Sequence, residues 1–137
     1  MGYSIGQVAK KTGLTTHTLR YYEKSGLLPF IRKSSSGLRV FSEEDLKWLS
    51  LIECLKETGM PLKGIKQYID WSAEGNSTLE KRLKMFEQHK INIDKKIALL
   101  EKNKSRIEYK IGLYKRAVKV GSLEKVLEEE KANKKQL

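Results

Sequence analysis

The 137-residue sequence predicts a mainly α-helical fold with one short β-hairpin, and three observations lead to this prediction. Helix-capping residues and glycines divide the first part of the chain into short helices. One stretch among them lacks a helical period and has the turn residues of a hairpin. A later run without proline has apolar residues that recur every four and three positions. We therefore expect a compact domain over residues 1–75, a long helix over 76–120, and a short C-terminal helix with a charged tail over 121–137.

Two short helices open the chain. Ser4 begins a capping box, and the helix that follows it ends at Gly13. Thr15 or Thr16 caps a second helix, which ends at Gly26. Because only about three residues join the two helices, they have the pattern of a helix-turn-helix, whose second helix lies in the major groove of DNA.

The stretch after the second helix predicts a β-hairpin. Apolar and basic residues at 30–32 and 38–41 flank the small, polar segment 33–37. Pro29 suits the start of an edge strand, and Gly37 suits the turn because glycine adopts positive φ without strain. A basic hairpin after a helix-turn-helix is a wing, which reaches along the DNA backbone or into the minor groove.

Two further helices complete the expected N-terminal domain. Ser42 caps the third helix, and the acidic residues 43–45 lie in its first turn, where the helix dipole favours negative charge. This helix ends at Gly59. Pro61 occupies the first position of a fourth helix, which ends at Gly75.

The long apolar run predicts a homodimer. A capping box at residues 77–80 begins one helix of roughly 40 residues, about 60 Å long. Its apolar stripe indicates a coiled coil, and since the chain holds no second helix of that length, a second copy must cover the stripe. Lys90 and Lys104 interrupt the stripe and favour an antiparallel pair, in which each lysine lies opposite an apolar residue and extends to water. The residues expected at the interface are Leu79, Leu83, Phe86, Ile93, Ile97, Leu100, Ile107, Ile111 and Tyr114.

The charge of the chain points to an anionic partner. The sequence has 28 Lys plus Arg against 17 Asp plus Glu, which gives a net charge of +11. Such a chain favours a polyphosphate or an anionic membrane surface. The first forty residues contain one acid, Glu23, whereas residues 41–60 are acidic, so the anion-facing surface is expected in the first forty residues. The basic residues there are Lys10, Lys11, Arg20, Lys24, Arg32, Lys33 and Arg39.

Several classes of protein are excluded by what the sequence lacks. No apolar run approaches the roughly 18 residues of a membrane span, and no signal peptide opens the chain, so we expect a cytoplasmic protein that does not bind a membrane. Cys54 is the single cysteine, which excludes a disulfide framework or a multi-cysteine metal site. His17 and His89 are far apart, so no metal site is predicted. No catalytic triad, Cys-His pair or phosphate-binding loop is present, and we predict neither an enzyme nor a cofactor.

Four motifs together resemble the MerR family of bacterial transcription regulators. They occupy residues 3–9, 19–23, 37–42 and 54–62, and the resemblance extends over residues 3–120. It implies a winged helix-turn-helix homodimer, joined by an antiparallel coiled coil, on a palindromic promoter with an over-long spacer. Activators of this type undertwist and kink the spacer so that RNA polymerase holoenzyme engages both promoter elements. Bending the duplex in this way costs on the order of 1–6 kcal/mol, which protein contacts offset.

The resemblance assigns DNA contacts to the second helix. Arg20 is expected to meet a guanine edge or a phosphate, and Tyr21 and Tyr22 to meet phosphates through their hydroxyls. The alternative is that one of the two tyrosines belongs to the core, since adjacent helical residues point in different directions. Thr16 and His17 lie in the first turn and are candidates for base discrimination, although Thr16 would otherwise only cap the helix.

Further DNA contacts are expected outside the second helix. Arg39 matches the wing arginine of the family, and Lys56 matches the basic position before the Gly-Met-Pro turn. Both are expected to hold the DNA backbone. Lys33 and Arg32 would add wing contacts or would simply be solvated. Each neutralised phosphate releases a counterion, so binding should depend steeply on salt.

Cys54 has two interpretations. Among the apolar residues of the third helix, a lone cysteine is usually a small buried hydrophobe. The chain also resembles the branch of the family that responds to aldehydes and other thiol-reactive electrophiles, in its short C-terminus and in this cysteine. That resemblance implies a sensor, in which alkylation rotates the DNA-binding domain relative to the coiled coil. Two alternatives remain open: a small organic ligand in an aromatic pocket of Tyr68, Trp71 and Phe86, and an excisionase-like protein that bends DNA without an effector.

Overall fold

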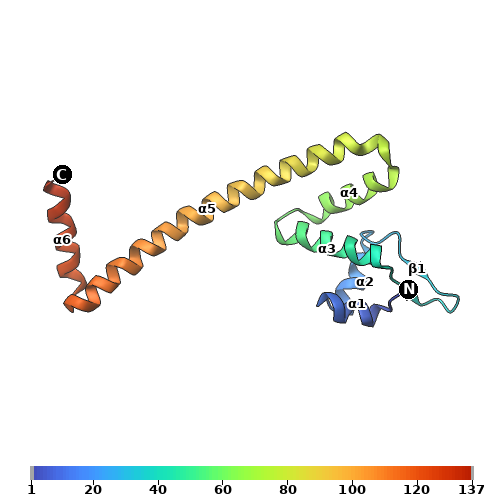
Figure 1. Cartoon of the computed structure of the whole chain (residues 1–137), viewed down its shortest axis with the longest axis horizontal. Helices are drawn as coiled ribbons and strands as arrows, with labels where there is room; N and C mark the ends of the chain where they lie inside the picture. Colours follow the sequence, from blue (N-terminus) through green and yellow to red (C-terminus); the bar gives the residue numbers. More distant parts are fainter. Residues whose placement is uncertain (1, 137) are drawn as a thin grey trace. The chain divides into compact units, whose positions relative to one another are not determined.

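The computed structural model describes residues 2–136 (Figure 1). The chain forms two compact units, Met1–His89 and Lys90–Leu137. Among the described residues, no helix is both long and apolar enough to cross a membrane.

The predicted helix-turn-helix is present in the first unit. It consists of α1 (Ile5–Thr12) and α2 (Thr16–Lys24). Ser4 makes both hydrogen bonds of a capping box, and α1 ends at Gly13 with a left-handed φ of 77°. Thr15 rather than Thr16 caps α2, because its hydroxyl accepts a hydrogen bond from the backbone amide of Thr18.

The wing is shorter than the sequence predicts. Strands β1 (Arg32–Lys33) and β2 (Arg39–Val40) pair antiparallel, with Arg32 opposite Val40. Phe30 lies in a turn instead of a strand, and its ring packs against Trp48 with the ring centroids 5.6 Å apart. Tertiary packing therefore removes Phe30 from the strand that its apolar side chain suggested.

Two further helices, which pack against each other, follow the wing in the chain. In α3 (Glu43–Glu57), Ser42 and Asp45 complete a second capping box. In α4 (Leu62–Glu74), Pro61 is the N-cap, with extended backbone angles, and lies one position before its predicted place. Both helices end close to the predicted glycines.

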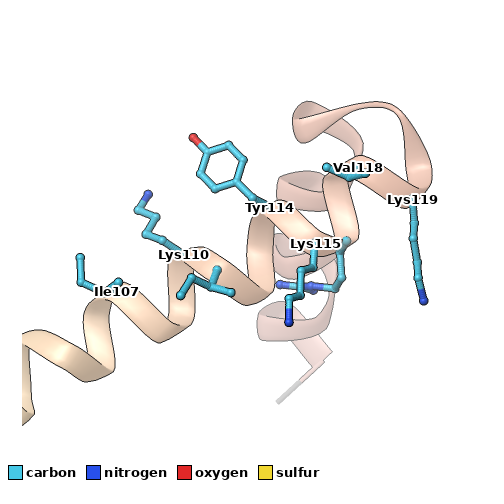
Figure 2. Close-up of a pocket in the computed structure, with 8 residues that line it drawn as sticks. Ile107, Lys110, Tyr114, Lys115, Val118 and Lys119 are labelled. Atoms are coloured by element: carbon cyan, nitrogen blue, oxygen red, sulfur yellow. The ribbon is translucent and has the colours of Figure 1, made fainter.

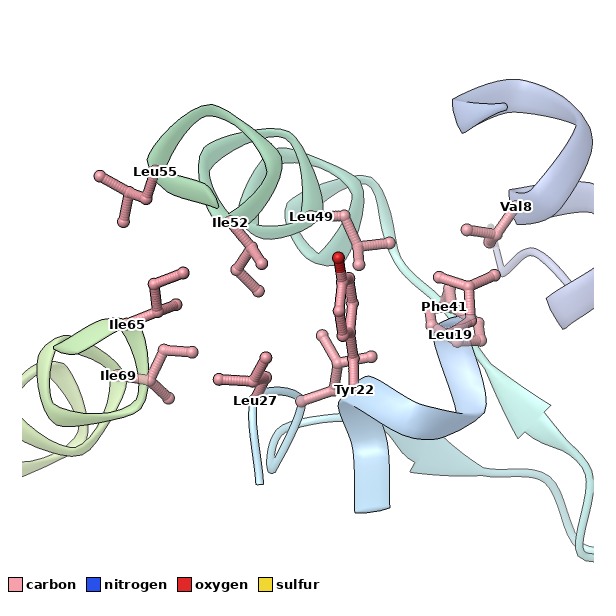
Figure 3. Close-up of a cluster of buried hydrophobic side chains, with 11 residues drawn as sticks. Val8, Leu19, Tyr22, Leu27, Phe41, Leu49, Ile52, Leu55, Ile65 and Ile69 are labelled. Carbon is pink, nitrogen blue, oxygen red and sulfur yellow. The ribbon is translucent and has the colours of Figure 1, made fainter. Parts of the chain in front are cut away.

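The hydrophobic core of the first unit lies where these four helices meet (Figure 3). Each helix contributes the face on which its apolar residues recur. Leu27, Leu28 and Phe41, from the loop after α2 and the end of the wing, complete the core. The buried hydrophobic residues of these four helices are Val8, Leu19, Tyr22, Leu49, Ile52, Leu55, Ile65 and Ile69.

The long helix is preceded by a 3₁₀ turn and does not begin with the predicted capping box. A 3₁₀ helix, η1 (Asn76–Thr78), precedes α5 (Leu79–Val120), which has 42 residues. The Thr78 hydroxyl donates to the carbonyl oxygen of Gly75 at 2.8 Å and to that of Trp71. A buried hydroxyl that donates to the end of α4 thus connects α4 to α5.

In the second unit, the end of α5 packs against the last helix of the chain. Helix α6 (Leu123–Gln136) has 14 residues, so the segment predicted to be a charged tail is helical. Val126 is buried against Leu113 and Ala117 of α5. Glu130 forms an ion pair with Arg116 and accepts a hydrogen bond from the Tyr109 hydroxyl. That hydrogen bond, followed by Arg116, lowers the pKa of Glu130.

Candidate nucleic-acid interface

The exposed face of α2 gathers the residues suited to contact DNA. His17, Arg20, Tyr21 and Lys24 are all exposed, and their spacing of three, four and seven positions places them on one side of the helix. Thr16 is half-buried at the start of α2. Lys24 was not singled out as a DNA contact from the sequence, although its position four residues after Arg20 is the signal that would have found it.

Tyr21 and Tyr22 have different environments. The Tyr21 side chain is 51% exposed, whereas Tyr22 is 1% exposed and belongs to the core. The Tyr22 hydroxyl donates to Glu53 and accepts from Lys56 Nζ at 3.1 Å. Burial, reinforced by the bond to Glu53, raises the pKa of Tyr22, and the bond to Tyr22 raises the pKa of Lys56. Tyr22 thereby fixes Lys56 beside the second helix.

The wing is linked to α2 through a charged pair. Arg39 Nε of β2 forms an ion pair with the Glu23 carboxylate of α2, and both side chains are partly buried. A guanidinium group has five N–H donors, so the Nη groups remain able to donate to another acceptor. Arg32 and Lys33 of β1 are both exposed. The ion pair therefore fixes the second helix and the wing relative to each other.

Leu38 at the turn of the wing is an apolar residue that sequence reasoning did not single out. Its side chain is 69% exposed beside the left-handed Gly37, whose φ is 83°. Exposed apolar side chains on DNA-binding elements can contact deoxyribose or enter the minor groove. The signal available in the sequence was an apolar residue next to a turn glycine.

Cys54 is exposed, which contradicts its interpretation as a small buried hydrophobe. The buried side of α3 carries Leu49, Ile52 and Leu55, and Cys54 points away from it. Cys54 lines a cavity of about 510 Å³ between α3 and the end of α1. The other lining residues are Lys11, Thr12, Leu14, Leu46, Leu49, Ser50, Glu53 and Glu57.

The predicted interface stripe of α5 is largely uncovered in the single chain. Leu100 is 69% exposed, and Lys90 and Lys104 form ion pairs with the residues four positions later, Asp94 and Glu108. In the second unit, apolar residues of the stripe line a hollow of about 710 Å³ (Figure 2). The exposed apolar residues of the stripe are Leu79, Leu83, Ile97, Leu100, Ile107, Ile111, Tyr114 and Val118.

Two predicted stripe residues are partly covered within the chain. Ile93 is half-buried. Phe86 packs edge-on against Tyr68, with ring centroids 4.9 Å apart, and belongs to the edge of the N-terminal core. Phe86 therefore has a packing role in its own subunit.

The aromatic residues form a row. Trp48 lies between Phe30 and Tyr68, at centroid distances of 5.6 and 5.7 Å, and Tyr68 contacts Phe86. Trp71 lies beneath Lys81 Nζ, 6.0 Å from the ring centre. Phe30 and Trp48, which the predicted aromatic pocket did not include, line a cavity of about 400 Å³.

Comparison with known proteins gives consistent matches over most of the chain. Residues 3–71 match the family described as MerR HTH family regulatory protein, and residues 46–109 match MerR, DNA binding. An uncharacterized HTH-type transcriptional regulator of Haemophilus influenzae is 41% identical over 92% of this chain and 93% of its own length. The HTH-type transcriptional regulator AdhR of Bacillus subtilis is 43% identical over 58% of this chain and 56% of its own length.

A solved structure supports the same assignment. HiNmlR, described as a MerR family regulator lacking the sensor domain and bound to promoter DNA, superposes with a TM-score of 0.84. It is 41% identical, and the match covers 90% of this chain and 98% of that chain.

Proposed function

The chain belongs to the MerR family of helix-turn-helix regulatory proteins, and from this premise we propose how it recognises a promoter and what it responds to. It is a DNA-binding transcriptional regulator and not an enzyme. We propose that α2 enters the major groove with Arg20 and His17 toward the bases, while Tyr21 and Lys24 contact phosphates. The common exposed face of these residues on α2 supports this arrangement.

The flanking contacts come from the wing and from the end of α3. Lys33 and the free Nη groups of Arg39 hold the backbone on one side of the recognition helix. Lys56, fixed by the Tyr22 hydroxyl, holds the backbone on the other side. In this arrangement Tyr22 acts through Lys56 and does not itself touch DNA, because its ring and hydroxyl are already engaged in the protein.

The DNA site is palindromic because two copies bind it. The exposed stripe of α5 carries the dimer, with the two copies antiparallel, so that Lys90 and Lys104 reach water beside apolar partners. An antiparallel pair fixes the separation of the two recognition helices, and distortion of the spacer between the half-sites lets RNA polymerase engage the promoter. Single, non-palindromic sites in a footprint would instead favour an architectural DNA binder.

The effector is an aldehyde or a related electrophile, and Cys54 is the group that reacts. The exposed Cys54 thiol at the wall of the cavity between α1 and α3 is the observation that carries this proposal. The thiolate adds to the carbonyl carbon, the C=O electron pair moves to oxygen, and that oxygen takes a proton to give a hemithioacetal. The adduct adds bulk between the two helices and changes how the recognition helix is presented.

Transcription from the protein's own upstream promoter tests the proposal. Wild type should activate when formaldehyde or methylglyoxal is added, Cys54→Ser should not, and both should bind DNA equally. Ser50→Ala is the matched control because Ser50 lines the same cavity, and this variant should respond like wild type. Equal responses of wild type and Cys54→Ser would remove the thiol from the mechanism.

A second candidate is supported by the cavity of about 400 Å³ beside Phe30 and Trp48. A cavity of this size with aromatic walls suits a small organic ligand. If Cys54→Ser responds like wild type and Trp48→Ala does not, this cavity is the effector site.

A further inference from the structure

His89 is a buried polar residue of α5 that the proposed function leaves without a role. Its side chain is 8% exposed, and its Nε2 lies 2.7 Å from the Thr58 hydroxyl oxygen. Both residues belong to the first compact unit. From its place in the sequence, His89 suggests only a metal ligand, and no metal site is predicted there. Burial of an imidazole in hydrogen-bond contact with another helix indicates that the contact itself matters for the structure.

Thr58 connects His89 to the helical turn that carries Cys54. Thr58 is the C-cap of α3, and its hydroxyl lies 2.7 Å from the Cys54 carbonyl oxygen and 3.3 Å from that of Leu55. The backbone amide of Thr58 also donates to the Cys54 carbonyl, at 3.1 Å. The hydroxyl and the backbone amide of Thr58 thus both contact the carbonyl oxygen of Cys54, the residue that bears the thiol.

The Thr58 hydroxyl lies within hydrogen-bond distance of three groups: the Nε2 of His89 and the carbonyl oxygens of Cys54 and Leu55. The tautomer of His89 decides which of the two side chains donates in the Thr58–His89 contact. In either direction, a series of contacts runs from His89 through Thr58 to the turn that bears Cys54, and it joins the end of α3 to α5.

This series responds to displacement of either helix. Hydrogen bonds weaken steeply when the donor–acceptor distance or angle departs from its optimum. A shift in the turn around Cys54 must therefore break the Thr58–His89 contact or move His89, and with it the first turns of α5. Packing between aliphatic side chains alone permits more sliding because the hydrophobic effect is not directional.

From this geometry we infer that His89 is a positioning residue, which transmits a displacement of the Cys54 turn to α5 through Thr58. The inference rests on the proposed function only in taking Cys54 as the sensing thiol. It adds the route by which a local adduct reaches the helix proposed to carry the dimer. His89 does not touch DNA or the effector in this role.

The test uses the single thiol of the full chain. Cys54 is labelled with N-ethylmaleimide, and amide hydrogen exchange over residues 79–95 is compared with and without the label. In wild type the label should accelerate exchange there by about two- to tenfold, the factor that corresponds to loss of one hydrogen bond of ordinary strength. In His89→Leu, labelled and unlabelled protein should exchange equally in this segment.

Matched variants separate the hydrogen bond from its surroundings. His89→Gln retains an amide donor in place of Nε2 and should restore the response. Glu87→Leu places the same leucine at an exposed position of α5 and should behave like wild type. Cys54→Trp adds bulk at the same position without chemical labelling and should reproduce the effect of the label.

Two outcomes overturn the inference. One is unchanged exchange over residues 79–95 in both labelled wild type and Cys54→Trp. The other is a response in His89→Leu equal to that of wild type. Failure of the proposed function is distinct from both, because it appears as loss of the transcriptional response to aldehydes, which the exchange measurement does not use.

Discussion

The adjacent tyrosines of α2 provide a sharp prediction, because the structure gives them opposite roles. Tyr22→Phe keeps the buried ring and removes only the hydroxyl that connects Glu53 and Lys56. A hydrogen bond to a charged group contributes about 1.5–3 kcal/mol when buried. Since both bonds are only part-buried and Lys56 is exposed, we expect the free energy of unfolding to fall by about 1–2 kcal/mol.

Tyr21→Phe is the matched control. The Tyr21 ring is 51% exposed and lies outside the core. Its unfolding free energy should therefore remain within about 0.5 kcal/mol of wild type. DNA affinity should nevertheless fall, because a phosphate contact is lost. Tyr22→Phe should weaken DNA binding only because it releases Lys56. In protein that already carries Lys56→Gln, adding Tyr22→Phe should therefore cause no further loss of affinity.

Urea denaturation followed by circular dichroism, at one fixed protein concentration, measures the stability of both variants. Fluorescence anisotropy with a labelled promoter fragment measures affinity. If Tyr21→Phe destabilises the protein and Tyr22→Phe does not, then Tyr21 and not Tyr22 is the tyrosine whose hydroxyl stabilises the fold, and the assignment of the two environments is wrong.

Three other measurements address the DNA surface, the dimer and the C-terminal helix. Lys24→Ala should reduce the slope of log affinity against log salt by about one unit, and an unchanged slope would show that Lys24 contacts no phosphate. Ile107→Asp should shift the sedimentation coefficient to that of a monomer, since a carboxylate would enter the apolar stripe; a dimer that persists would place the interface elsewhere. The folded-state pKa of Glu130 lies below the usual pKa of a glutamate, because of its bonds to Tyr109 and Arg116. These bonds therefore stabilise the α5–α6 contact fully when the pH is above that usual pKa, and the stabilisation is lost as the pH falls through the lowered pKa. Circular dichroism, followed as the pH falls below the usual pKa of a glutamate, should therefore show a larger loss of helix in wild type than in Glu130→Gln, because the glutamine does not titrate.

The order and type of the helices could be predicted because their ends are encoded locally. The hydroxyls of Ser4 and Ser42 each accept a hydrogen bond from the backbone amide three residues later. This capping pattern depends only on spacing along the sequence. The turn at Thr78 could not be predicted in the same way. Its hydroxyl donates to α4 carbonyls, and that choice depends on where α4 ends in space.

The sequence motifs name most residues of the candidate site, but they miss Lys24 and Leu38 and do not give the environments of the residues they name. The sequence offered two tyrosines and could not decide which one faces the core, because that depends on the packing of α3 against α2. The pairing of Arg39 with Glu23 joins residues 16 positions apart and follows from how the wing folds back. Cys54 is exposed although its neighbour Leu55 is buried, because adjacent residues of a helix point in different directions. The run of apolar residues around Cys54 does not show which of them face the core.

The uncovered stripe of α5 also has a consequence for the life of the protein in a cell. In the single chain Leu100, Ile107 and Ile111 are exposed, and in the dimer that we propose they would stay so until a newly made chain meets another copy. Exposed aliphatic side chains of this kind are what chaperones and quality-control proteases recognise. Orphan chains at low abundance would be removed, while assembled ones persist, so the amount of regulator would depend more than linearly on its rate of synthesis.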